Sequence, residues 1–233
     1  SLQQFKKANE CYDEAISLDK KRKYPWFNKG QCLDELGQYK KAIECYDEAI
    51  KIDKKYKLAL LNKGDILKTK LGQLKKAKEC YRKSVKIHPQ NANDWWMDGI
   101  CFYNLSQYRK AIKCYDTAIK HAKKPASKPL IGALPIKVEE IWNSWGDALN
   151  ELGDYKEALK CYEEASKLDK KWRYPLCEQA RILRSSGEYE EALKCNNAAI
   201  RYNKNDTVAW DQKGSTYYIM GRYKEALKYF EKA

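Results

Sequence analysis

The sequence predicts an all-α fold, a solenoid of antiparallel helix pairs, on the strength of three observations. A cysteine recurs with spacings of 34, 35, 34, 47 and 34 residues, at Cys11, Cys45, Cys80, Cys114, Cys161 and Cys195. Ten of the eleven glycines fall at two positions of the same repeat. Around each cysteine, a small residue, an aromatic residue and a second small residue are spaced i, i+4 and i+7, which places them on one helix face. Repeats of this length are units that pack on their neighbours.

The two glycine positions predict where each unit bends. The first group lies within apolar helical patterns, where a missing side chain permits close helix approach; it comprises Gly30, Gly64, Gly99, Gly146 and Gly214. The second group lies in segments such as LGQY, where a left-handed residue ends one helix before the next begins; it comprises Gly37, Gly72, Gly153, Gly187 and Gly221. Each unit is therefore expected to contain two short helices.

The repeat divides the chain into one orphan helix, six units and an insert. Residues 1–22 are expected to form the second helix of a truncated repeat, and the complete units are expected at 23–56, 57–91, 92–124, 139–172 and 173–206, followed by a truncated unit at 207–233. The spacing of 47 reflects a Pro-rich apolar insert at 125–138. Neither end shows a polar capping helix, so two explanations stay open: a fragment of a longer protein, or ends that pair with another copy.

The segment WFNKGQCLDELGQYKKAIECYDEAI at 26–50 resembles the tetratricopeptide repeat, with Lys29 in place of the usual Leu and Leu33 in place of the first Tyr. The unit at 176–200 departs more, with Ala180 at the glycine position and Asn196 at the aromatic position. The resemblance covers almost the whole chain. It implies a right-handed superhelical array whose first helices line a concave groove, and a protein that binds extended peptides or partner helices there.

Composition gives only coarse limits on location and partners. No apolar run is long enough to span a bilayer and no signal peptide is visible, so a soluble, cytoplasmic protein is expected. Nine cysteines without a CxxC pair fit a reducing compartment. The net charge of +14 raises nucleic acid or an acidic membrane as partners, although a Lys-rich bias of coding sequence explains the charge equally well.

No catalytic or cofactor-binding pattern appears, so the sequence predicts neither an enzyme nor a cofactor site. It contains no Gly-rich phosphate loop, HExxH motif or nucleophile elbow. Zinc needs four converging ligands, and only His88 and His121 supplement the scattered thiols. The recurring cysteine is therefore interpreted as a small buried packing residue rather than a metal or redox ladder.

The resemblance places candidate binding residues around the glycine of each first helix. The expected groove carries Phe27, Asn28, Gln31, Leu61, Asn62, Asp65, Trp96, Met97, Ile100, Tyr103, Asn143, Asp147 and Arg181. Over all six first helices the resemblance implies 36 groove positions, these thirteen among them, and the 36 hold eight acids and three bases, which favours a basic or neutral partner. Trp96, Met97, Ile100 and Tyr103 form an apolar stretch of the kind that makes binding hot spots.

The prediction is thus a protein–protein interaction scaffold that holds a peptide or helical segment in its groove. Polyanion binding through a basic outer surface is the alternative, carried by lysines of the DKK connectors. The insert PLIGAL within 123–138 is too hydrophobic for a solvated linker. We expect it to pack near Trp96 as a lid or as a built-in pseudo-ligand, with a solvated loop as the remaining alternative.

Overall fold

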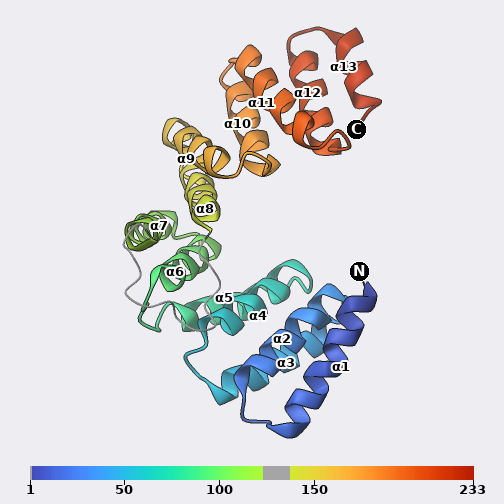
Figure 1. Cartoon of the computed structure of the whole chain (residues 1–233). Coiled ribbons are helices and arrows are strands. Elements are labelled where there is room, and N and C mark those ends of the chain that lie inside the picture. The colour runs from blue at the N-terminus through green and yellow to red at the C-terminus, as the bar shows by residue number, and fades with distance from the viewer. Residues whose placement is uncertain (1, 123–136) are drawn as a thin grey trace. The chain divides into compact units, whose positions relative to one another are not determined.

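The computed structural model describes residues 2–122 and 137–233, and every regular element in these two ranges is an α-helix (Figure 1). The hypothesis that PLIGAL packs near Trp96 concerns residues that lie outside this description. The helices in order are α1 (Leu2–Leu18), α2 (Lys23–Glu35), α3 (Tyr39–Ile52), α4 (Lys57–Thr69), α5 (Leu74–Ser84), α6 (Ala92–Asn104), α7 (Tyr108–Ala122), α8 (Val138–Glu151), α9 (Tyr155–Leu168), α10 (Arg173–Ser185), α11 (Tyr189–Tyr202), α12 (Thr207–Ile219) and α13 (Tyr223–Phe230).

The glycines between the two helices of a unit adopt the predicted left-handed conformation. Gly37 has φ 72°, its N–H donates to the Asp34 carbonyl at 2.8 Å, and the next N–H, of Gln38, donates to the Leu33 carbonyl at 2.8 Å. These bonds satisfy carbonyls at the end of α2. In the segment LSQY the same conformation falls on Ser106, with φ 59°, the one non-glycine residue with positive φ in the described chain.

The glycines inside the first helices allow the predicted close approach of an aromatic ring. A Cβ added to Gly64 would lie 2.6 Å from Cε1 of Tyr81, and one added to Gly30 would lie 2.6 Å from Cε1 of Tyr46. Real Cβ atoms do not come this close, so each ring occupies the space that the glycine leaves open. In the repeat at 173–206, Ala180 stands at the position of the glycine and Asn196 at that of the aromatic ring. Both are fully buried.

The recurring cysteines are mostly packing residues, as predicted. Cys45, Cys80, Cys114 and Cys161 are buried, whereas Cys11 is exposed and Cys195 is half-buried. Burial raises the pKa of Cys45 to about 11 and that of Cys161 to about 12. Among the described residues no group of His, Cys, Asp and Glu is arranged to hold a metal ion.

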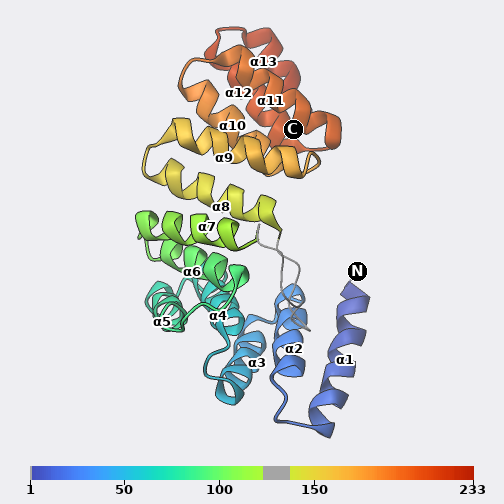
Figure 2. The same ribbon diagram turned by 60° about the vertical axis from the view of Figure 1, so that its left-hand side comes forward.

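Each helix packs mainly on its neighbours along the chain. The chain consists of two compact units, Ser1–Cys114 (unit 1) and Tyr115–Ala233 (unit 2). In unit 1, α2 packs on α3 and α4 on α5, while α3 also contacts α4 and α5 contacts α6. In unit 2, α8 pairs with α9, α10 with α11 and α12 with α13, and consecutive pairs touch in the same way (Figure 2). None of the described helices is long and apolar enough to cross a membrane.

Candidate functional site

In unit 1 the predicted groove residues come from α2, α4 and α6, and two of them prove to be core residues. Phe27 is 4% exposed, and the centroid of its ring lies 5.6 Å from that of the Tyr46 ring and 5.1 Å from that of the Tyr56 ring. Leu61 is 5% exposed and belongs to a second core cluster with Tyr81. These two side chains hold helices together and have almost no surface left for a ligand, which narrows the candidate face of unit 1 to the other predicted residues.

The polar candidates of unit 1 keep contact with solvent. Asn28 and Asn62 are half-buried at the same register of α2 and α4, and Gln31 is exposed. Asp65 is half-buried and accepts a hydrogen bond of 2.7 Å from the hydroxyl of Tyr81. Burial raises the pKa of Asp65, and the bond from Tyr81 opposes this rise. The aromatic ring of the second helix thus fixes the carboxylate of the first.

The apolar candidates of unit 1 lie together on α6. Trp96, Met97, Ile100 and Tyr103 are all half-buried, with positions i, i+1, i+4 and i+7 on one side of the helix. Met97 and Ile100 pack against the core cluster that contains Leu61. The four side chains therefore form a partly exposed apolar row (the α6 row) whose inner edge is anchored in the core of unit 1.

In unit 2 the predicted residues lie in two hydrogen-bonded polar groups, one centred on α8 and one on α10, whose charges interact. Asn143 is buried, and its Nδ2 donates to Oδ2 of Asp147 at 3.2 Å. Oδ1 of Asp147 accepts from the Tyr162 hydroxyl at 2.7 Å. Burial raises the pKa of Asp147 to about 6. On α10, Nε and Nη2 of Arg181 both donate to Oε2 of Glu178, at 2.9 and 2.7 Å.

Glu178 and Arg184 of unit 2 also stand at groove positions that the family resemblance implies. Glu178 stands at the register of Asn28 and Asn62, so the repeat alignment carried the signal for it. Arg184 reaches from α10 to α12, where its Nη1 donates to the carbonyl oxygen of Gln212 at 3.1 Å. No pattern in the sequence indicates the contact between Arg184 and Gln212, because it depends on how consecutive first helices pack.

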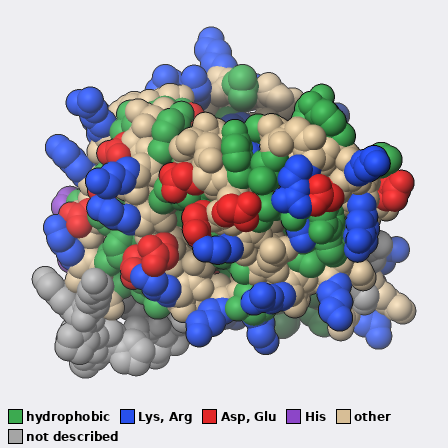
Figure 3. Space-filling model, turned by 90° about the horizontal axis from the view of Figure 1, so that it is seen from above, with side chains coloured by type: hydrophobic (Ala, Val, Ile, Leu, Met, Phe, Trp, Pro, Cys, Tyr) green, Lys and Arg blue, Asp and Glu red, His purple; other side chains and the backbone are tan. Residues whose placement is uncertain are grey.

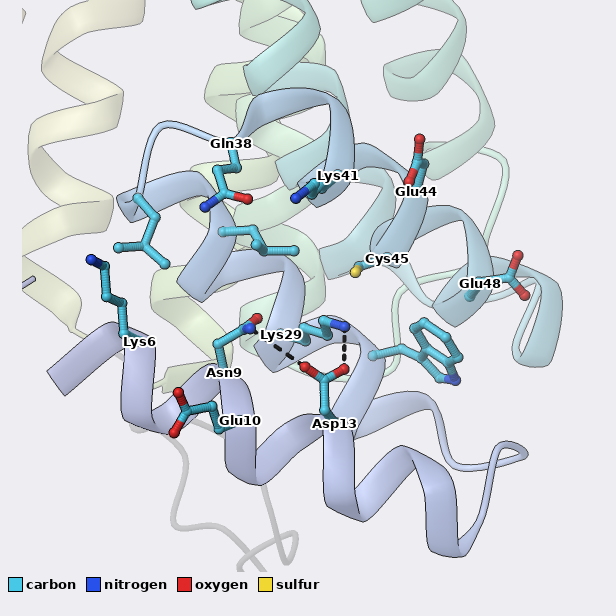
Figure 4. A pocket seen from close by; sticks show the side chains of 13 residues that line it. Lys6, Asn9, Glu10, Asp13, Lys29, Gln38, Lys41, Glu44, Cys45 and Glu48 are labelled. Atoms are coloured by element: carbon cyan, nitrogen blue, oxygen red, sulfur yellow. Dashed lines mark hydrogen bonds and ion pairs between the residues drawn. The ribbon is translucent and has the colours of Figure 1, made fainter. Parts of the chain in front are cut away.

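A surface pocket of about 730 Å³ lies elsewhere, between α1, α2 and α3 (Figure 4). Its lining mixes cations and anions, and Lys29 of α2 pairs with Asp13 of α1 inside it. Asn9 donates to the same carboxylate at 3.5 Å. None of the predicted groove residues lines this pocket. The thiol of Cys45 in its wall has a raised pKa, so the pocket offers no activated nucleophile.

The basic residues of the outer helices are interspersed with acids. On the face drawn in Figure 3, Lys and Arg side chains are spread out, with Asp and Glu side chains among them. Several lysines pair one turn away with acids, as Lys160 does with Glu157 and Lys194 with Glu191. In the DKK connectors the Asp has a structural role, since the Asp53 carboxylate accepts from the N–H of Lys55 at 2.9 Å. The connector lysines themselves are exposed.

Comparison with protein families identifies the class of protein. Models described as tetratricopeptide repeat match residues 24–56, 59–91, 139–171 and 208–233. Together these matches cover more than half of the chain, so the chain belongs to the tetratricopeptide repeat family. The repeats of this family make it a protein–protein interaction scaffold. No curated protein matches the chain in sequence.

Solved structures share the fold at low sequence identity. PilW, a type IV pilus biogenesis factor, has a TM-score of 0.73 at 16% identity, with 89% of this chain and 90% of that chain covered. The Cut9–Hcn1 hetero-tetramer of APC/C has a TM-score of 0.73 at 17% identity, with 92% and 40% covered. YrrB, a tetratricopeptide repeat protein with an unusual peptide-binding site, has a TM-score of 0.52 at 20% identity, with 86% and 96% covered.

Proposed function

We propose that the chain binds an extended or helical segment of a partner protein on the faces of its first helices. The observation that carries this proposal is the α6 row of Trp96, Met97, Ile100 and Tyr103. Aromatic and Met side chains are enriched in binding hot spots, and a row anchored in the core but partly exposed gives a ligand a rigid apolar platform. The peptide-binding site of the similar YrrB structure supports the same use of the fold.

The polar candidates on the other first helices of unit 1 suit backbone recognition. Side-chain amides such as Asn28 and Asn62 offer both a donor and an acceptor, which matches the N–H and C=O groups of an extended peptide. Asp65 is held by Tyr81 and adds negative charge. We therefore propose a basic or neutral segment as the ligand, anchored by apolar side chains on the α6 row.

A displayed library of random 16-residue peptides, selected on the immobilised chain, tests this proposal. Affinities of the selected peptides are then compared for the wild type, for Trp96→Ala/Tyr103→Ala, and for Leu74→Ala/Tyr155→Ala. The last variant removes two exposed apolar side chains from second helices and is the matched control. Loss of hot-spot contacts of about 2 kcal/mol predicts a drop in affinity of roughly 30-fold in the first variant only. Equal affinity of all three proteins would refute the proposal.

The exposed connector lysines support polyanion binding as a second candidate function. Lys20, Lys21, Lys54, Lys55, Lys170 and Lys171 are all exposed and follow an Asp that shapes the turn. Retention on heparin that falls after all six are changed to Gln, and that falls with rising salt, would favour this function. Retention that the six changes leave unaltered would remove it.

A further inference from the structure

The polar side chains on α8 and α10 differ from the residues at the same positions of α2 and α4. We call Asn143, Asp147, Tyr162, Glu178 and Arg181 the Asp147 cluster. Asn143 occupies a position that holds Phe27 in α2 and Leu61 in α4, both of them core residues. An amide that is buried at such a position costs free energy unless its hydrogen bonds are made.

Half of the Asn143 amide lacks a partner. Its Nδ2 donates to Asp147, but its Oδ1 is buried and accepts no hydrogen bond from any residue that the structure describes. Both atoms are bonded to the same carbon, so the unpaired oxygen lies next to the amide nitrogen that donates to Asp147. The residue as a whole is 6% exposed, so water does not reach it freely. The cluster therefore contains a buried acceptor that needs a donor.

The charges of the Asp147 cluster also favour an additional cationic donor. Nε and Nη2 of Arg181 both donate to Oε2 of Glu178, so these two bonds engage one oxygen of that carboxylate. Asp147 accepts from the uncharged groups of Tyr162 and Asn143, while Tyr174 and the charge of Arg181 also lower its pKa. Burial and the nearby Glu178 carboxylate raise the pKa of Asp147 to about 6. Two carboxylates and an amide oxygen thus share a single cation, and the ionised form of Asp147 is poorly compensated.

The cluster is open at its outer side. The side chain of Glu178 is 18% exposed and that of Arg181 is 41% exposed, while Asp147 is half-buried. A cationic group from solvent therefore meets the carboxylates of Glu178 and Asp147 first.

We propose that the Asp147 cluster is a subsite of unit 2 that binds one cationic side chain, the ammonium of a lysine or the guanidinium of an arginine, of a partner protein. This inference rests on the peptide binding proposed above and names a side chain that the partner must supply. The cation donates to the Asn143 oxygen and to the carboxylates of Asp147 and Glu178, and it supplies the positive charge that Arg181 alone does not provide.

The test uses small probes and the whole chain. The side-chain amide signals of Asn143 are followed by ¹⁵N NMR while Nα-acetyl-lysine methylamide or Nα-acetyl-arginine methylamide is added, and the norleucine analogue serves as the uncharged control. We expect a saturable shift of the Asn143 signals with at least one cationic probe and none with norleucine. Equal shifts with norleucine, or unmoved Asn143 signals with both cations, would overturn the subsite.

Variants separate binding from general electrostatics. Asp147→Asn removes one charge while keeping an acceptor for the Tyr162 hydroxyl, so it should weaken the shift-derived affinity at least fivefold. Asn143→Leu, which copies Leu61 and keeps the position packed, removes the buried acceptor; its binding is followed on the backbone signals of α8. Glu190→Gln removes one exposed charge from α11 and should leave the affinity unchanged. If Glu190→Gln weakens binding as much as Asp147→Asn, the effect is bulk charge and the proposal fails.

The two proposals fail in different ways. Selected peptides that depend on Trp96 and Tyr103, together with cationic probes that leave Asn143 unmoved, would overturn the subsite alone. Probes that bind the Asp147 cluster while no peptide is selected would overturn the peptide-binding function and leave a free cationic metabolite as the ligand class.

Discussion

Lys57 at the start of α4 and Asp98 in the middle of α6 form an ion pair that is almost fully buried, with side chains 3% and 4% exposed. The equivalent lysine of α2, Lys23, pairs instead with Asp53 of the following connector. The connector after α5, KIHPQN, has no aspartate at the position equivalent to Asp53. Asp98 of α6 stands at the position where α2 and α4 carry Lys29 and Lys63. The ion pair therefore ties two consecutive first helices, α4 and α6, together.

We predict that Lys57→Met destabilises unit 1 by about 3–5 kcal/mol, because it leaves the carboxylate of Asp98 buried without a counter-charge. Burial already raises the pKa of Asp98 in the wild type, and Lys57 opposes the rise. Urea denaturation followed by circular dichroism measures the effect. Lys57→Met/Asp98→Leu should recover most of the loss, since no charge is then buried. A single variant as stable as the wild type would contradict this account.

The buried Asn196 of α11 marks a second weak point, in unit 2. Both atoms of its amide are buried without hydrogen-bond partners, and it replaces the ring that packs on glycine elsewhere. We predict that Ala180→Gly/Asn196→Phe, which copies the Gly214–Phe230 pair, raises the free energy of unfolding by about 1–3 kcal/mol. Helix propensity lost at residue 180, about 1 kcal/mol, is included in this range.

The single changes provide the control for this pair. Asn196→Phe alone should destabilise, because the ring would clash with the Cβ of Ala180, just as a Cβ added to Gly214 would lie 2.7 Å from Cδ1 of Phe230. Ala180→Gly alone should destabilise by loss of helix propensity and packing. Additive effects in the double-mutant cycle would show that the two positions do not pack as a pair.

The sequence was sufficient for the repeat, the helix ends and the glycine–aromatic contacts. Gly37 and Gly64 illustrate the reason, because their roles depend only on neighbours within one unit. The periodic pattern was not sufficient to separate ligand-facing from buried positions, as Phe27 shows. Exposure of a first-helix residue depends on the next first helix, and contacts such as Lys57–Asp98 span 41 residues, so local periodicity carries no signal for them.

The cysteines are expected to differ in reactivity according to burial. Thiolate is the reactive form, and a pKa of about 11 at Cys45 or about 12 at Cys161 leaves on the order of 0.1% thiolate or less at pH 8. Cys11 is exposed. We predict that a disulfide reagent modifies Cys11 first in the native chain, and all nine cysteines only in denaturant. Mass spectrometry counts the adducts, and Cys11→Ser should remove the fast phase. Rapid native modification of Cys45 would contradict the packing role.

Asp147 should make the stability of unit 2 depend on pH. Its pKa is raised from 3.8 to about 6 by burial and by Glu178, while Tyr162, Tyr174 and Arg181 oppose the rise. The native chain then binds this proton more tightly than the unfolded chain does, so its contribution to stability is greatest below pH 4 and is lost as the pH rises to about 6.

Asp147→Asn removes the loss of stability that the ionisation of Asp147 causes. At pH 7 we therefore expect the variant to be more stable than the wild type by on the order of 1–2 kcal/mol. The new amide keeps the Tyr162 hydrogen bond, and a half-turn of the Asn143 amide lets its unpaired oxygen accept from Asn at position 147. Urea midpoints of both proteins at pH 4, 5, 6 and 7 give the comparison, in which the difference should grow with pH. A difference that does not change with pH would mean that Asp147 titrates normally. A variant that gains stability while losing affinity for cationic probes would show that the carboxylate is retained for binding, because binding sites commonly sacrifice stability for function.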